Sequence, residues 1–179
     1  MKHDLGYILL AGLSRLQILG VVDGEKLYLQ IILNLNNLKM IYLSRHAHFC
    51  AAHKLYNTKW SKEQNEEVFG PCANENWHGH NFDLIVTIRG VPDPETGFVM
   101  NFKDLNRLIK EEIIQKVDHK NLNLDVDFLA GKITSCEVVT IEFWKILAPL
   151  IAQTTQERAQ LHSIKLYETA RNYAEYYGE

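Results

Sequence analysis

The sequence predicts an α+β fold in which an antiparallel sheet carries helices on one face. The prediction rests on the order of segments: three extended runs come first, two helical patterns follow, and one extended run comes last. Strands and helices do not alternate one by one, as they would in a parallel α/β sheet. The 179 residues, 46% of them hydrophobic, suffice for one well-filled core, so we expect one folded domain.

A domain boundary is expected near residue 40. Before it, turn signals and periodic runs show no clear pairing, whereas every later segment has the pattern of a regular element. We therefore expect residues 1–39 to be an N-terminal extension and residues 40–179 to be the folded domain. Residues 7–22 are apolar, but Arg15 and Gln17 interrupt them and no small-residue cleavage pattern follows, so we expect no signal peptide.

Four segments have the composition of strands. Residues 40–53 alternate in hydropathy, and residues 77–89 are rich in isoleucine, valine and threonine. Residues 90–97 contain two glycines and two prolines, which predicts a turn. Residues 98–102 resume as a strand, so we expect a hairpin with a long tip around this turn. Residues 163–167 are the last predicted strand.

Two helices are expected between the third and fourth strands. The first has apolar residues spaced so that they share one helical face: Leu105, Leu108, Ile109, Ile113 and Val117. The second begins at residues 134–137, whose sequence Thr-Ser-Cys-Glu has the form of a capping box, and it ends near Pro149. As the reciprocal acid of that box, Glu137 would need no further function.

Charge and cysteine content exclude some classes of function. A formal net charge of −3 and a pI near 6.2 give no basic face of the kind that binds phosphate backbones, so we expect no nucleic-acid partner. A small anionic substrate stays compatible, because local charge decides that. We expect no membrane partner either. Three cysteines are too few for a disulfide framework and odd in number, which favours the cytoplasm.

A His-Gly-His sequence at residues 78–80 predicts a metal site. On a strand, His78 and His80 point to the same face, with a glycine between them that lets another group approach. Imidazole nitrogens suit zinc, and a catalytic zinc site needs three protein ligands. His46, His48 and His53 lie on the preceding predicted strand, where residues 46 and 48 face opposite to 53. Spacing alone does not decide which face holds the third ligand.

Cys72 lies shortly before the histidine pair, in a loop rich in turn-forming residues. Two functions compete for it. Its thiolate either closes a structural zinc site as fourth ligand or stands free beside the metal as base or nucleophile. Cys50 and Cys136 fit better as small buried apolar residues.

Two acidic positions admit both a structural and a functional interpretation. Asp118 and His119 have the elements of a proton relay if the helix has ended before them, but a histidine at a helix C-terminus also offsets the helix dipole. Glu168 follows the last strand, where it is either a solvated carboxylate or an anchor for an amine-rich ring.

Six motifs, in this order, resemble the 6-pyruvoyl-tetrahydropterin synthase and 6-carboxytetrahydropterin synthase family over residues 40–179. They are Phe-Cys-Ala-Ala-His at 49–53, Phe-Gly-Pro-Cys at 69–72, His-Gly-His-Asn at 78–81, Thr-Gly-Phe-Val-Met at 96–100, Asp-His-Lys-Asn-Leu at 118–122 and Tyr-Glu-Thr at 167–169. Two positions depart from the family, with Cys136 in place of the common threonine and Val138 in place of the common asparagine.

The resemblance assigns a role to each candidate residue. It implies that Zn²⁺ is held by His53, His78 and His80. It implies that Cys72 accepts a proton, with Asp118 and His119 as its relay. Glu168 would bind the pterin ring and Glu137 would approach it. The implied architecture is the tunnelling fold, in which four-stranded antiparallel sheets with two helices on one face join into barrels, usually as a homohexamer with active sites between subunits.

The implied substrate is the small molecule 7,8-dihydroneopterin triphosphate. We expect a zinc-dependent lyase that forms 6-carboxy-5,6,7,8-tetrahydropterin for queuosine biosynthesis, with loss of acetaldehyde and triphosphate. The alternative is a 6-pyruvoyl-tetrahydropterin synthase, which eliminates triphosphate from the same substrate, and the five residues between Cys72 and His78 resemble that branch. A second alternative is a non-catalytic, zinc-stabilised oligomerisation module, with Cys72 as fourth ligand.

Overall fold

The computed structural model describes residues 39–179. Apart from Lys39, the expected N-terminal extension lies outside the described residues. Within the described range, no helix combines the length and the apolar character that a membrane crossing requires.

In residues 39–179, five strands form one sheet in the order β3-β1-β2-β4-β5. Neighbours among β1, β2, β4 and β5 are antiparallel, and the two-residue β3 pairs parallel with β1. The predicted α+β class is confirmed, with four antiparallel strands, although one of these, β5, is not one of the four segments predicted. The bounds are Ile41–His53 for β1, His78–Gly90 for β2, Lys120–Asn121 for β3, Ala159–Tyr167 for β4 and Tyr173–Tyr176 for β5.

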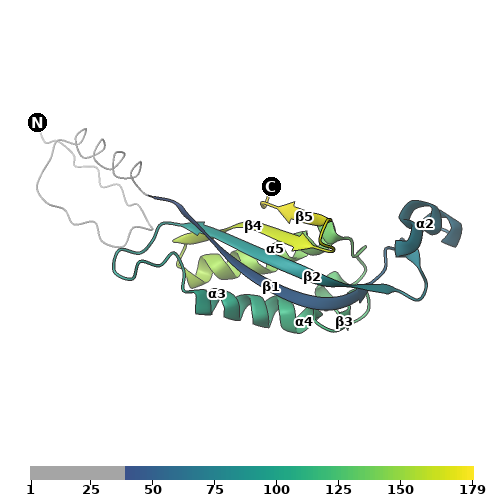
Figure 1. The fold of residues 1–179 in the computed structure, drawn as a ribbon, viewed down its shortest axis with the longest axis horizontal. Coiled ribbons are helices and arrows are strands. Elements are labelled where there is room, and N and C mark those ends of the chain that lie inside the picture. The colour runs from purple at the N-terminus through teal and green to yellow at the C-terminus, as the bar shows by residue number, and fades with distance from the viewer. Residues whose placement is uncertain (1–38) are drawn as a thin grey trace, which may run out of the picture. The chain divides into compact units, whose positions relative to one another are not determined.

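Helices cover one face of this sheet (Figure 1). The first is continuous from α3, Phe102–Ile109, through a π-helical turn, Lys110–Ile114, into α4, Gln115–Val117. The second is α5, Cys136–Thr154. A shorter helix, α2, Lys62–Phe69, lies beyond the end of the long β1–β2 pair (Figure 1).

The core lies between the sheet and these helices. Along the second half of β1 and nearly all of β2, alternate side chains are buried, as a sheet with one covered face requires. Phe49 of β1 stacks on Phe82 of β2 with ring centroids 4.8 Å apart, and Phe143 of α5 meets Phe49 edge-on at 6.0 Å. This packing fixes α5 against the end of the sheet where β1 finishes and β2 begins.

The π-helical turn explains how the first helix keeps its apolar face buried. Four of its predicted core residues, Leu105, Ile109, Ile113 and Val117, recur every fourth residue, a spacing that drifts around an ordinary α-helix. A π turn has more residues per turn and corrects this drift. All four side chains are at most 2% exposed, so the predicted face is confirmed.

The predicted strand at residues 98–102 is wrong. The carbonyl of Phe98 turns back to accept from the backbone N–H of Asp93, and the Asp93 carboxylate accepts from Glu95 and Thr96, which closes a compact loop. Asn101 then caps α3 by accepting from the N–H of Lys103. The edge of β2 that a hairpin would need is occupied by β4 instead.

The boundaries of the second helix also differ from the prediction. Ser135 is its N-cap and accepts from the N–H of Val138, so Glu137 is not the reciprocal acid of a capping box. Thr134 cannot cap, because its side chain is engaged elsewhere in the core. The helix passes through Pro149 to Thr154, since the burial of Leu147 and Ile151 on either side outweighs one missing hydrogen bond.

One further boundary differs from the prediction, and two elements were not predicted. The strand β4 begins at Ala159 rather than at residue 163, β5 was not expected, and α2 lies between the first two predicted strands, where no helix was expected. A signal for α2 is present, because Ser61 accepts from the N–H of Gln64 in the pattern of an N-cap.

Candidate metal and substrate site

Three histidines meet at the end of the β1–β2 pair. His53 and His78 are directly opposite each other in the register, and His80 is two residues further on the same face of β2. One ligand atom from each ring lies within 4.8 Å of the others, and this is the one such cluster among the described residues. The β1–β2 register has no shift, so His46 and His48 face the opposite side, where His46 contacts Asp83 at 3.1 Å.

The orientation of His53 leaves its Nε2 with a lone pair that a metal could bind. Its Nδ1 lies 2.8 Å from the carbonyl oxygen of Thr134, which can only accept, so Nδ1 carries the proton and Nε2 does not. The ring is 1% exposed. Burial lowers the pKa of His53, and it also lowers the pKa of His78, so both rings are neutral near pH 7.

Three buried nitrogens in this cluster lack a hydrogen-bond partner within residues 39–179. They are Nε2 of His53 and both ring nitrogens of His78. Leaving such atoms unsatisfied typically costs about 1–3 kcal/mol each. A divalent metal bound through one nitrogen of each ring would remove this cost for Nε2 of His53 and for one nitrogen of His78, so the residues present fit a three-histidine zinc site with an open position.

Glu168 faces this cluster from the residue after β4. Its Oε1 lies 3.4 Å from Nε2 of His53 and 3.8 Å from Nε2 of His80. The carboxylate is 24% exposed, so it is not the solvated strand end that one interpretation assumed. Its oxygens do not lie within 4.8 Å of all three histidine ligand atoms, so Glu168 is not part of the ligand cluster. A carboxylate so placed can accept hydrogen bonds from a ligand beside the metal.

Asp118 and His119 follow directly after the end of the first helix. The first helix ends at Val117, Asp118 is extended, and His119 has a positive φ of 56°. The Asp118 carboxylate accepts from the N–H of Cys50 at 2.9 Å, and its other oxygen lies 3.8 Å from Nε2 of His119. The His119 side chain is 81% exposed. The condition for a relay, that the helix has ended, is therefore met.

Cys72 lies apart from both groups. It sits in a short 3₁₀ turn, Gly70–Ala73, whose Cys72 carbonyl accepts from the N–H of Leu55 just beyond β1. Cys72 is not in the histidine cluster, which argues against it as a fourth ligand. Across residues 39–179, no side-chain hydrogen bond or ion pair joins it to Asp118 or His119.

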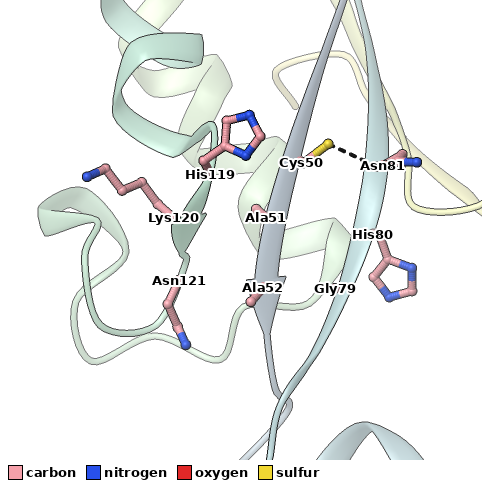
Figure 2. A pocket seen from close by; sticks show the side chains of 9 residues that line it. All are labelled: Cys50, Ala51, Ala52, Gly79, His80, Asn81, His119, Lys120 and Asn121. Carbon is pink, nitrogen blue, oxygen red and sulfur yellow. Dashed lines mark hydrogen bonds between the residues drawn. The ribbon is translucent and has the colours of Figure 1, made fainter.

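An open pocket of about 540 Å³ lies beside the relay pair. Figure 2 shows Cys50 and Asn81 on neighbouring strands, with His119 and Lys120 on the segment beside β1. The Cys50 thiol donates to Oδ1 of Asn81 at 2.9 Å, so Cys50 is a half-buried polar contact rather than the apolar core residue we expected. His80 also lines the pocket, which brings its rim to the histidine cluster.

Cys136 and Glu137 stand at the start of α5. The Cys136 thiol donates to the carbonyl of Leu166, two residues before Glu168, and burial raises its pKa to about 11. It is half-buried. Glu137 is exposed, and in the described structure no ion pair or side-chain hydrogen bond joins it to the histidine cluster.

The family model of 6-pyruvoyl tetrahydropterin synthase matches residues 42–179 of this chain. The chain belongs to this family. A 6-pyruvoyl tetrahydrobiopterin synthase of Pongo abelii is 41% identical over 137 residues, which are 76% of this chain and 91% of that protein. The solved structure of the Caenorhabditis elegans 6-pyruvoyl tetrahydropterin synthase matches with a TM-score of 0.71 and 31% identity, over 79% of this chain and 98% of that one.

The other branch of the family matches over a shorter stretch. A putative 6-carboxy-5,6,7,8-tetrahydropterin synthase of Archaeoglobus fulgidus is 44% identical over 50 residues, which are 28% of this chain and 42% of that protein. Membership of the family is therefore shown along the whole described domain, whereas likeness to the carboxy enzyme is shown over a part of it.

Proposed function

We propose that this protein is a 6-pyruvoyl-tetrahydropterin synthase that eliminates triphosphate from 7,8-dihydroneopterin triphosphate. The observation that carries the proposal is the cluster of His53, His78 and His80, in which nitrogens of His53 and His78 are buried and unpartnered, with the Glu168 carboxylate beside it. A metal ligand set and a hydrogen-bond acceptor so close together suit a substrate that has hydroxyl groups near an amine-rich ring.

The pyruvoyl product replaces the carboxy product as the first choice. Sequence alone favoured 6-carboxy-5,6,7,8-tetrahydropterin, but long-range similarity favours the pyruvoyl branch: 137 matched residues against 50. The five residues between Cys72 and His78 point the same way.

Zinc is the metal that fits three imidazole ligands with an open position. When bound, it would polarise a substrate hydroxyl and make the neighbouring carbon proton more acidic. The chain's part is to present the rings as ligands, and for His53 burial favours the neutral ring while the Thr134 carbonyl fixes its orientation. We propose His53, His78 and His80 as the ligands.

The remaining roles fall to side chains around this centre. Cys72 would take the substrate proton as a thiolate, with Asp118 and His119 as its relay. Glu168 would accept from the amino group and ring N–H of the pterin, a bidentate contact that fixes the ring. We propose Glu137 as a second, weaker contact, since it is exposed at the start of α5.

The positions of Cys72 and His119 suggest that the site is completed by a second copy of the chain. His119 is largely exposed, and within one chain no contact joins it to Cys72 among residues 39–179. We therefore propose a homo-oligomer, a hexamer in the family's usual arrangement, with active sites between subunits. The alternative of a non-catalytic zinc module loses its main support, because Cys72 is not part of the ligand cluster.

The deciding experiment is incubation of the zinc-loaded protein with 7,8-dihydroneopterin triphosphate and identification of the products. We expect triphosphate and 6-pyruvoyl-tetrahydropterin without acetaldehyde. Release of acetaldehyde with 6-carboxytetrahydropterin would establish the other branch, and no turnover by an intact, zinc-loaded oligomer would leave only the non-catalytic module. The Cys72→Ala variant is the control, because it should keep zinc while losing turnover.

A further inference from the structure

Asn123 makes a clamp on the backbone next to a proposed metal ligand. Its Oδ1 accepts from the N–H of Lys54 at 3.1 Å, and its Nδ2 donates to the carbonyl of the same residue at 3.1 Å. Both polar groups of residue 54 are therefore satisfied by one side chain, directly after His53 at the end of β1. Asn123 lies just outside the motif at residues 118–122.

The same side chain reaches the residue that orients His53. Oδ1 of Asn123 also accepts from Oγ1 of Thr134 at 3.0 Å. Thr134 is fully buried, and its carbonyl is the acceptor for Nδ1 of His53 at 2.8 Å. A chain of two hydrogen bonds thus runs from Asn123 through Thr134 to the His53 ring, while a second path runs through the Lys54 backbone.

Hydrogen bonds of the backbone at residues 122 and 123 hold the segment that carries this side chain. The N–H of Asn123 donates to Oδ1 of Asn121 at 3.0 Å, and the N–H of Leu122 donates to the carbonyl of Ala52 at 2.8 Å. These contacts hold the segment after β3 against the end of β1. The position of the Asn123 side chain relative to Lys54 and Thr134 is therefore fixed by its backbone.

We infer that Asn123 is a positioning residue for the metal site, acting on His53 through Thr134 and the Lys54 backbone. The inference rests on the proposed three-histidine site. Groups that orient a ligand imidazole typically change metal affinity by about 10- to 100-fold when they are removed. Without Asn123, the Thr134 hydroxyl keeps only its longer contact to the Lys54 carbonyl, at 3.4 Å, and the His53 ring loses its fixed tilt toward the cluster.

The chain offers a matched control in Asn65. Its Oδ1 accepts from the N–H of Asn57 at 2.7 Å, and its Nδ2 donates to the Asn57 carbonyl at 3.0 Å, so it makes the same clamp on another residue. Asn65 is fully buried but has no hydrogen bond to Thr134 or His53 in the described structure. It reports the general effect of losing a buried asparagine.

The test compares zinc affinity by competition with a chromophoric chelator, with folding followed by far-UV circular dichroism and thermal melting of the metal-free proteins. We expect Asn123→Ala to bind zinc about 10- to 100-fold more weakly than the parent. Asn123→Asp, which keeps the two acceptor contacts, should lie closer to the parent. Asn65→Ala should keep the parent's zinc affinity even where its melting temperature falls.

Thr134→Val serves if Asn123→Ala does not fold, because it keeps the Thr134 carbonyl and removes only the hydroxyl link. We expect it to weaken zinc binding as well. Parent-like affinity in Asn123→Ala or, failing that, in Thr134→Val would overturn the inference, and so would an equal loss in Asn65→Ala. If the parent itself binds no zinc, the proposed function fails instead, which separates the two.

Discussion

Single residues around the histidine cluster differ in what they can do, although several share a side-chain type. The chain has eight histidines, and three on the core face of β1 and β2 meet at one point. His46 and His48 are on the same strand as His53, yet the pleat sends them to the exposed face. The alternation of side chains along the strand, rather than residue type, separates the proposed ligand His53 from His46 and His48.

This difference gives a matched pair of variants. His78→Ala removes one of three proposed ligands, so we expect purified protein to lose most of its zinc from about one per chain. His48→Ala removes an exposed imidazole from the opposite face and should leave the zinc content unchanged. Elemental analysis of both proteins decides the point, and parent-like zinc in His78→Ala would move the site elsewhere.

Glu168 is expected to act on the substrate rather than on the metal. Its carboxylate lies beside His53 and His80 but outside the ligand cluster. Glu168→Gln should therefore retain zinc but bind the pterin more weakly. Turnover should fall as well, on the order of 100-fold, because a ring misplaced by about 1 Å loses alignment with the reacting groups. Steady-state kinetics and zinc content measure the two effects separately.

Glu137→Gln is the comparison for this variant, since Glu137 is exposed and should contribute less. A Glu168→Gln enzyme with parent-like activity at both low and saturating substrate would refute the anchor role. Loss of zinc from that variant would show instead that the carboxylate belongs to the metal site.

At the scale of elements, what the sequence revealed depends on how local the determining contacts are. The long strands and the buried face of the first helix follow from periodicity within each segment, and both predictions hold. The strand predicted at residues 98–102 is wrong because their composition suits a strand, whereas β4, which is distant in sequence, pairs with that edge of β2. The helix end predicted near Pro149 is wrong because the helix is stabilised beyond it by the burial of Ile151, a tertiary contact that the local sequence does not reveal.

The candidate site shows the same division. Spacing predicted the His78 and His80 pair, but the third ligand needed the β1–β2 register, which residue spacing alone left open. Asn123 and Thr134 carried no signal, because their partners are 69 and 81 residues away. Their roles depend on loops that meet only in the folded chain.

A buried carboxylate in the first half of α5 predicts an effect of pH on stability. Glu142 is 9% exposed and accepts from Lys132 and Lys145, each at 2.8 Å. Burial alone would raise the pKa of Glu142, but these two hydrogen bonds and charges outweigh it and hold the pKa below its usual 4.5. The unfolded chain thus binds a proton more readily at this position than the folded one.

We expect this contribution to stability to be complete above pH 4.5 and to be lost as the pH falls from 4.5 through the lower pKa of the folded state. Glu142→Gln should lower the free energy of unfolding by about 1–2 kcal/mol at neutral pH, since both lysines are exposed, and should flatten the acid limb. Urea unfolding from pH 3 to 7 measures this. An unchanged acid limb would assign it to other carboxylates.

At the scale of the whole molecule, the proposed catalytic groups point in different directions. The metal ligands and Glu168 gather at the end of the β1–β2 pair, whereas the His119 ring is exposed beside the open pocket. Cys72 projects from a turn next to α2 and contacts neither the relay nor the histidines among residues 39–179. These positions make sense if one subunit supplies Cys72 and the metal and its neighbour supplies Asp118 and His119.

This arrangement predicts that two inactive variants restore each other. Cys72→Ala and His119→Ala should each lose turnover while keeping zinc and oligomeric state. When the two are unfolded together and refolded as mixed oligomers, about one site in four combines an intact Cys72 with an intact His119 from the neighbouring subunit. Activity should therefore rise to about a quarter of the parent's, whereas the variants refolded separately and then mixed should stay inactive. If co-refolded oligomers remain inactive while co-refolded parent and variant chains recover activity in proportion to the parent chains, Cys72 and His119 serve the same site from a single chain, and the sharing of sites between subunits is refuted.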